Sequence, residues 1–145
     1  MEFNRENVKN KPWCLDCDIE VDFKTKIQTT KAVVKGIEVE FDAIINYCAK
    51  CGRPVFIYEA EKINQIRCYD EYKRKKGLLT TEEIIGIRKK LGLSQTGLAK
   101  AIKVGKKNIT RYELGAIQDA SIDLLIRLLD KHPELFEIKK IKKST

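Results

Sequence analysis

The sequence predicts an α+β fold of two domains, a small antiparallel β domain followed by an all-α domain of five helices. Residues 19–45 contain stretches in which apolar and polar residues alternate, as they do in half-buried strands. Residues 81–131 instead repeat their apolar residues every three to four positions, which is typical of amphipathic helices. This spacing is expected to point Ile84, Leu98, Ile109, Ile126 and Leu129 inward. A chain of 145 residues has room for two such small domains.

The alternation is clearest at residues 19–28 and 37–45, which we expect to form two antiparallel strands. Gly36 breaks the pattern between them, and residues 31–35 are a candidate for a short separate strand. Residues 54–58 follow as a further candidate strand.

Two Cys-x-x-Cys pairs flank these strands, and they consist of Cys14, Cys17, Cys48 and Cys51. Each pair can present two thiolates to one ion, and Gly52 allows a tight turn at the second pair. A tetrahedral set of four sulfurs suits Zn²⁺, so we expect one structural zinc ion per chain, stapling a domain too small to be held by its core alone. Iron bound as in rubredoxin and a redox-active cysteine pair are the alternatives, although one redox pair would leave the other pair unexplained.

The composition argues for an intracellular location. No apolar run approaches the ~20 residues of a membrane span, and residues 1–5 lack the apolar start of a signal peptide. We therefore expect a cytoplasmic protein with no membrane partner, in which cysteines more often bind metals than form disulfides. Cys68 lies in a helical stretch away from the two pairs, so we expect a buried thiol without a role at the metal.

The domain boundary is predicted at a charged helix. Residues 1–58 would form the zinc-stapled β domain, residues 59–77 a helical linker, and residues 78–145 the all-α domain. The whole chain carries a net charge of +8. Residues 78–145 contain 14 Lys/Arg against 8 Asp/Glu, so the positive excess lies where contact with phosphates would require it.

Helix boundaries in the second domain are indicated by capping residues and breakers. Thr81 is expected to cap the first helix and Gly92 to end it, while Ser121 would cap a later helix that Pro133 ends. The later helix carries a second apolar strip at Leu124 and Leu128. That strip could contact a second subunit or pack on the remaining C-terminal residues, of which 138–143 are basic and expected to fray.

Residues 94–115 predict a helix-turn-helix motif. Ser94 caps a short helix, and Ile109 and Tyr112 of a second helix point inward by their spacing. The Val104–Gly105 pair forms the turn, where Gly105 is expected to adopt the positive φ that ends the first helix. We expect DNA contacts from the exposed side of the motif, at Ser94, Gln95, Lys106, Lys107, Asn108, Thr110 and Arg111. The alternative is an ordinary helical hairpin with a solvated basic face.

Within that set, Arg111 and Lys107 lie one turn apart on the outward face and are expected to contact bases. Ser94 and Gln95 at a helix N-terminus, and Lys106, are expected to hold phosphates. No Ser/His/Asp set, phosphate-binding loop or carboxylate pair is present, so no catalytic residue is predicted and we expect no enzyme activity. The single histidine, His132, has a position typical of a structural residue at a helix C-terminus.

The order Ser-Gln, Leu-Ala, Val-Gly and Ile-Thr-Arg-Tyr-Glu-x-Gly resembles the phage-repressor-like (XRE) family of helix-turn-helix domains. The chain as a whole resembles MqsA-type (YgiT-type zinc finger) antitoxins over residues 14–138. The resemblance rests on this motif, the two cysteine pairs, the segment Val34-Lys35-Gly36-Ile37 and the run Leu129-Asp130-Lys131-His132-Pro133-Glu134-Leu135.

That resemblance implies structural zinc on the four cysteines and a cognate toxin, typically an mRNA-cleaving ribonuclease, bound and neutralised by the N-terminal domain. It also implies a homodimer formed by the C-terminal domain, which represses its own operon at a palindromic double-stranded operator. The family's base-reading Arg falls on Arg111, whereas its base-reading Asn falls on Lys107, so the operator sequence is not implied. The alternative function is a stand-alone zinc-containing transcriptional regulator without a toxin.

Overall fold

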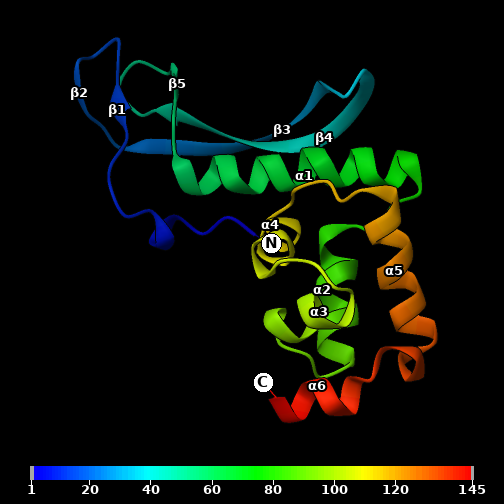
Figure 1. The fold of residues 1–145 in the computed structure, drawn as a ribbon. Helices are drawn as coiled ribbons and strands as arrows, with labels where there is room; N and C mark the ends of the chain where they lie inside the picture. The colour runs from blue at the N-terminus through cyan, green and yellow to red at the C-terminus, as the bar shows by residue number, and fades with distance from the viewer. Residues whose placement is uncertain (1, 145) are drawn as a thin grey trace. The chain divides into compact units, whose positions relative to one another are not determined.

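A computed structural model describes residues 2–144 and shows the predicted α+β arrangement, an antiparallel β region followed by helices (Figure 1). The chain divides between Glu71 and Tyr72 into two compact units, called here the β unit and the helical unit. The elements in chain order are η1 (Arg5–Asn7), β1 (Trp13–Cys14), β2 (Ile19–Glu20), β3 (Phe23–Val34), β4 (Ile37–Cys48), β5 (Pro54–Val55), α1 (Tyr58–Lys76), α2 (Thr81–Lys90), α3 (Gln95–Ala101), α4 (Lys106–Glu113), α5 (Ala120–Lys131), η2 (Pro133–Phe136) and α6 (Ile138–Ser144).

The β unit is built on a long antiparallel hairpin of β3 and β4, each 12 residues long. Lys35 and Gly36 form its two-residue turn with φ of 48° and 80°, the conformation of a type I′ turn. Because this turn matches the strand twist, β3 continues to Val34, and the separate strand expected at residues 31–35 does not exist. Strand β5 pairs with the end of β4, while β1 and β2 form a separate small hairpin.

Helix α1 runs along the hairpin (Figure 1). The side-chain amide of Asn64 accepts from the backbone N–H of Ile44 at 2.7 Å and donates to the Ile44 carbonyl at 2.9 Å. This pairing joins α1 to β4 over an apolar core that includes Phe23, Ile57 and Ile63. Ile27 belongs to the apolar positions of the alternation in residues 19–28, but it is 65% exposed. It lies on the edge strand β3, whereas the hydrogen bonds from α1 go to β4.

The helical unit contains α2 to α6 around one apolar core. The side chains of Ile84, Leu98, Ile109, Ile126 and Leu129 are all 0% exposed. Each of these positions was expected to point inward from its spacing, and the structure confirms that expectation. Among residues 2–144, no helix combines the length and apolarity that a membrane crossing demands.

Several helix boundaries differ from those expected. Thr80, not Thr81, caps α2, because its hydroxyl accepts from the N–H of Glu83 while the Glu83 carboxylate accepts from the N–H of Thr80. Helix α5 begins at Ala120, ahead of the expected Ser121. Residues 138–143, expected to fray, are helical, since Ile138 and Ile141 pack on the core from one face of α6.

The turn between α3 and α4 also differs in detail from the one expected. Gly105 has φ of −70° and caps α4, so it does not supply the positive φ expected at the end of α3. Lys103 adopts the positive φ instead, at 57°. The N–H of Val104 donates to the Ala99 carbonyl at 2.9 Å and the N–H of Lys103 to Lys100, which is the Schellman pattern of a helix end.

Lys103→Gly should therefore stabilise the helical unit by about 0.5–1 kcal/mol, because glycine adopts a positive φ without a steric cost. Urea unfolding followed by helical circular dichroism measures the change. Lys106→Gly is the matched control, because Lys106 has helical φ at the start of α4, and this substitution should lower stability or leave it unchanged. Equal effects of the two substitutions would contradict strain at Lys103.

Candidate metal centre and nucleic-acid interface

The four paired cysteines converge at one end of the β unit. Cys14 is the last residue of β1 and Cys48 the last residue of β4, while Cys17 and Cys51 lie in the turns that follow them. Antiparallel register places Phe23 opposite Cys48, so the long hairpin brings the second pair back beside the first. The structure thus assembles all four residues that the sequence assigned to a metal.

Their sulfur atoms have the spacing of a single ion site. The Sγ atoms of Cys14 and Cys51 are 3.5 Å apart, and those of Cys17 and Cys48 are 4.0 Å apart. All four sulfurs lie within 4.8 Å of one another. A tetrahedral Zn²⁺ with its usual sulfur bonds separates its ligands by ~3.8 Å, so the cluster fits one such ion closely.

The protonation behaviour of the thiols also favours a cation. The backbone N–H of Cys51, with that of Lys50, donates to the Cys48 sulfur and lowers the pKa of Cys48 to about 7. Burial and the neighbouring thiols raise the pKa of Cys17 to about 12. Crowded thiols resist ionising together, whereas a bound divalent cation favours four thiolates. The donor set therefore fits a structural metal ion.

The two cysteine turns have the same backbone design. The N–H of Gly52 donates to the Cys48 carbonyl at 2.9 Å, and the N–H of Asp18 donates to the Cys14 carbonyl at 2.8 Å. Both residues have positive φ, 78° at Gly52 and 54° at Asp18. A tetrahedral site needs both turns folded back tightly, and the sequence signalled only the one that contains glycine.

Cys68 lies in α1 and does not belong to the four-sulfur group. Its side chain is buried, and burial raises its thiol pKa. This placement agrees with the expectation of a thiol without a role at the metal.

The second predicted site is the outward face of α4. Lys106, Lys107 and Arg111 are exposed, whereas Ile109 and Tyr112 are buried. A helix with one buried apolar face and one exposed basic face can enter a DNA groove without unfolding any of its core. Asn108 and Thr110, also expected to contact DNA, are half-buried.

A polar network joins α2, α3 and α4. Two of its members, Arg88 and Glu113, were not predicted from the sequence. Arg88 donates to the buried Glu113 carboxylate at 2.6 Å, and the Gln95 side chain donates to the same carboxylate. The Thr110 hydroxyl donates to the Gln95 side-chain oxygen at 3.0 Å. An acid directly after the inward-facing Tyr112 was the available signal for Glu113.

This network bears on the expected phosphate contacts. Both ends of the Gln95 amide are engaged within the helical unit, so this side chain helps to orient the two helices. The Ser94 hydroxyl accepts from the N–H of Gly97 at 2.9 Å, which confirms Ser94 as the N-cap of α3. The side chains of Lys106, Lys107 and Arg111 make no hydrogen bond or ion pair within residues 2–144, so a ligand would find them uncommitted.

Comparison with known proteins gives a further line of evidence. Residues 11–140 match the family described as the antitoxin component of a bacterial toxin–antitoxin system, MqsA. A relative named Antitoxin MqsA, from Escherichia coli (strain K12), is 32% identical over 108 residues. That alignment covers 72% of this chain and 77% of the relative.

We expect about one Zn²⁺ per chain in freshly purified protein, measured by inductively coupled plasma mass spectrometry. Replacing Cys48 with serine should remove most of the bound metal, because three thiolates hold zinc more weakly than four. Cys68→Ser is the matched control and should leave the metal content unchanged. Purified protein that contains neither zinc nor iron would contradict a metal centre.

The shared turn design gives a second prediction. Gly52→Ala should weaken metal retention against a competing chelator, because a side chain at φ 78° costs about 1–2 kcal/mol. Asp18→Gly, at the equivalent position of the first turn, should strengthen retention or leave it unchanged. Space does not explain a loss at Gly52, since an added Cβ meets no atom within 4 Å. Parallel effects of the two substitutions would show that positive φ is not required.

Proposed function

The chain belongs to the MqsA antitoxin family, the antitoxin component of bacterial toxin–antitoxin systems, and on that premise we propose that it binds and neutralises a cognate toxin through its β unit. We propose further that its helical unit binds the operator of its own operon and represses it, and that the chain acts by binding rather than catalysis. The carrying observation is the pairing in one chain of a four-sulfur cluster with a helix-turn-helix whose basic face is exposed.

Several features of the β unit support a protein partner. Residues 1–55 carry nine basic and nine acidic side chains, so this region offers no electrostatic attraction to nucleic acid. Apolar side chains around the cysteine turns are exposed, with Trp13 at 53%, Leu15 at 88% and Phe56 at 68%. Exposed apolar groups of this size are typical of protein interfaces. The toxin is proposed to be a ribonuclease that cleaves mRNA.

The helical unit is proposed to read DNA as a dimer. Leu124 and Leu128 lie one turn apart on α5 and are 58% and 37% exposed. The C-terminal residues leave them exposed, because Ile138 and Ile141 of α6 pack on the core instead. A symmetric contact through α5 would pair two recognition helices for a palindrome whose half-sites lie about one helical turn, or a multiple of that, apart.

We also propose that the metal is zinc and that the β domain (residues 1–58) and the DNA-binding domain (residues 78–145) fold independently on either side of the linker (residues 59–77). Helix α1 spans that linker region as a continuous helix. The apolar clusters of the two units are separate in this chain, and the cluster of the β unit includes Ala60 and Ile63 from the first turns of α1. The start of the linker helix therefore belongs to the core of the β unit.

We expect the full chain to co-purify with the product of a neighbouring gene and to restore growth when both are expressed together. Leu15→Asp, which places a charge on the most exposed apolar side chain of the cysteine turns, should weaken this rescue. Leu135→Asp, the same change on an exposed leucine of the helical unit, is the control and should preserve it. If no neighbouring gene encodes a toxic product, the result would favour a stand-alone transcriptional regulator.

Arg111→Ala should cost about 1–3 kcal/mol per half-site and relax the preference at one base position, because a guanidinium can bind a guanine edge with two hydrogen bonds. Lys106→Ala should instead weaken binding to every sequence and lower the salt slope by about one, because it removes one phosphate-binding charge. Salt titrations with cognate and scrambled duplexes distinguish these outcomes. Equal reductions in affinity for both duplexes with Arg111→Ala would show that Arg111 does not read a base.

A further inference from the structure

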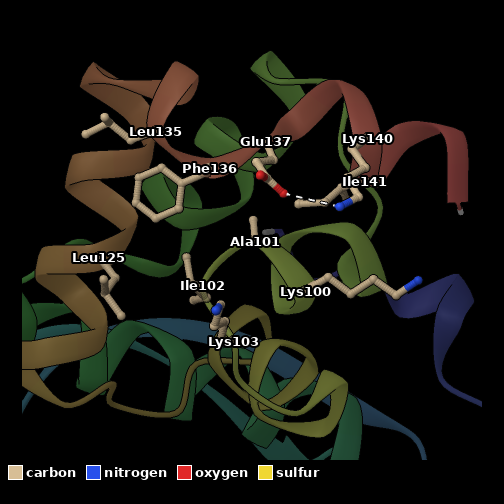
Figure 2. A pocket seen from close by; sticks show the side chains of 10 residues that line it. All are labelled: Lys100, Ala101, Ile102, Lys103, Leu125, Leu135, Phe136, Glu137, Lys140 and Ile141. Carbon is tan, nitrogen blue, oxygen red and sulfur yellow. Dashed lines mark ion pairs between the residues drawn. The ribbon is translucent and has the colours of Figure 1, made fainter.

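The helical unit contains a cavity that the proposed DNA and toxin contacts do not use. Its volume is about 790 Å³, and it opens between the end of α3, α5, η2 and α6 (Figure 2). Protein cavities that hold small molecules usually enclose ~300–1,000 Å³, so this one is large enough for a ligand. The lining residues are Lys100, Ala101, Ile102, Lys103, Leu125, Leu135, Phe136, Glu137, Lys140 and Ile141.

The wall of the cavity is apolar. Ala101 and Ile102 form one side from α3, while Leu125 and Phe136 face them from α5 and η2 (Figure 2). Leu135 also lines the cavity and is 68% exposed. A ligand with an apolar body would remove this surface from water, which favours binding.

The rim of the cavity is positively charged. Lys100, Lys103 and Lys140 line it against a single acid, Glu137, which leaves a net charge of +2. Glu137 pairs with Lys140 at 3.8 Å, and both side chains are more than 70% exposed. The side chains of Lys100 and Lys103 make no hydrogen bond or ion pair within residues 2–144, so both can meet an anion.

We propose that this cavity binds a small amphipathic anion, in which an apolar chain or ring system carries one carboxylate or sulfonate group. The apolar body would lie against Ile102, Leu125 and Phe136, and the acidic group would meet Lys103 and Lys140 at the rim. An uncharged lipid would leave the lysines unmatched, and a cation would be repelled. Because Lys103 is the strained residue of the helix-turn-helix turn, the ligand would contact the element that connects α3 to α4.

Other occupants explain the cavity less well. A duplex phosphate would meet the lysines but would leave the apolar wall uncovered. A second copy of the chain has a more direct contact in the exposed leucines Leu124 and Leu128 of α5, and neither of them lines the cavity.

Isothermal titration of the full chain with dodecanoate, below its micelle concentration, tests the proposal. Dodecanoate should bind at one site per chain, dodecan-1-ol more weakly, and dodecyltrimethylammonium weakest. The double variant Lys103→Glu/Lys140→Glu should weaken dodecanoate about tenfold while leaving dodecan-1-ol nearly unchanged, since it reverses the charge of the rim and keeps the apolar wall. Leu135→Ser should weaken both.

Matched controls lie outside the cavity. Lys131→Glu on α5 and Leu114→Ser after α4 make the same chemical changes at exposed positions, and both should leave dodecanoate binding unchanged. Equal binding of the three amphiphiles, or equal reductions in cavity and control variants, would overturn the proposal. So would a cavity variant that changes the oligomeric mass while dodecanoate still binds, because a second copy would then be the occupant. Binding of inorganic phosphate as tightly as dodecanoate would overturn it in favour of a phosphate contact.

Discussion

The β unit depends on the meeting of four thiols within 4.8 Å at the open end of one hairpin. Neither cysteine turn carries a core large enough to fix it, and crowded thiols do not ionise together without a counter-charge. The hairpin register supplies the geometry, because Cys48 lies opposite Phe23 immediately after the first turn. A bound divalent cation would convert that geometry into folding free energy, in addition to what the small apolar clusters of this unit contribute.

The helical unit is organised by a different constraint. Its apolar core fixes each helix, but the buried Glu113 carboxylate joins α4 to α2 through Arg88 and to α3 through Gln95. Removing one partner from such a network leaves a buried charge uncompensated, which costs far more than an exposed contact. The exposed face of α4 can therefore be basic and unpaired, because the orientation of the helix is secured on its other side.

The parts that could be predicted from the sequence are those set by local chemistry. A Cys-x-x-Cys turn brings two sulfurs together whatever surrounds it, so the four residues of the sulfur cluster could be predicted. Helix periodicity identified the inward residues of the helical unit, such as Ile84 and Leu98, because each position depends only on its own helix. The parts that could not be predicted depend on competing neighbours. Lys103 takes the positive φ that Gly105 was expected to take.

Contacts between distant segments could not be predicted from the sequence either. Nothing local pairs Arg88 with Glu113, since 25 residues separate them and the contact exists only once α2 and α4 pack. The continuity of β3 to Val34 likewise depends on a two-residue turn in which a lysine adopts a left-handed conformation, which residue preferences disfavour. The α6 helix forms because the core of the helical unit offers a surface for Ile138 and Ile141.

The central claim is that a metal ion holds the β unit together while the helical unit stands on its own core. Hydrogen–deuterium exchange of the full chain, before and after removal of metal by a chelator, tests this most directly. The account predicts that amide protection is lost across residues 13–58 and retained across residues 78–144. Protection that survives in both regions, or is lost in both, would contradict it.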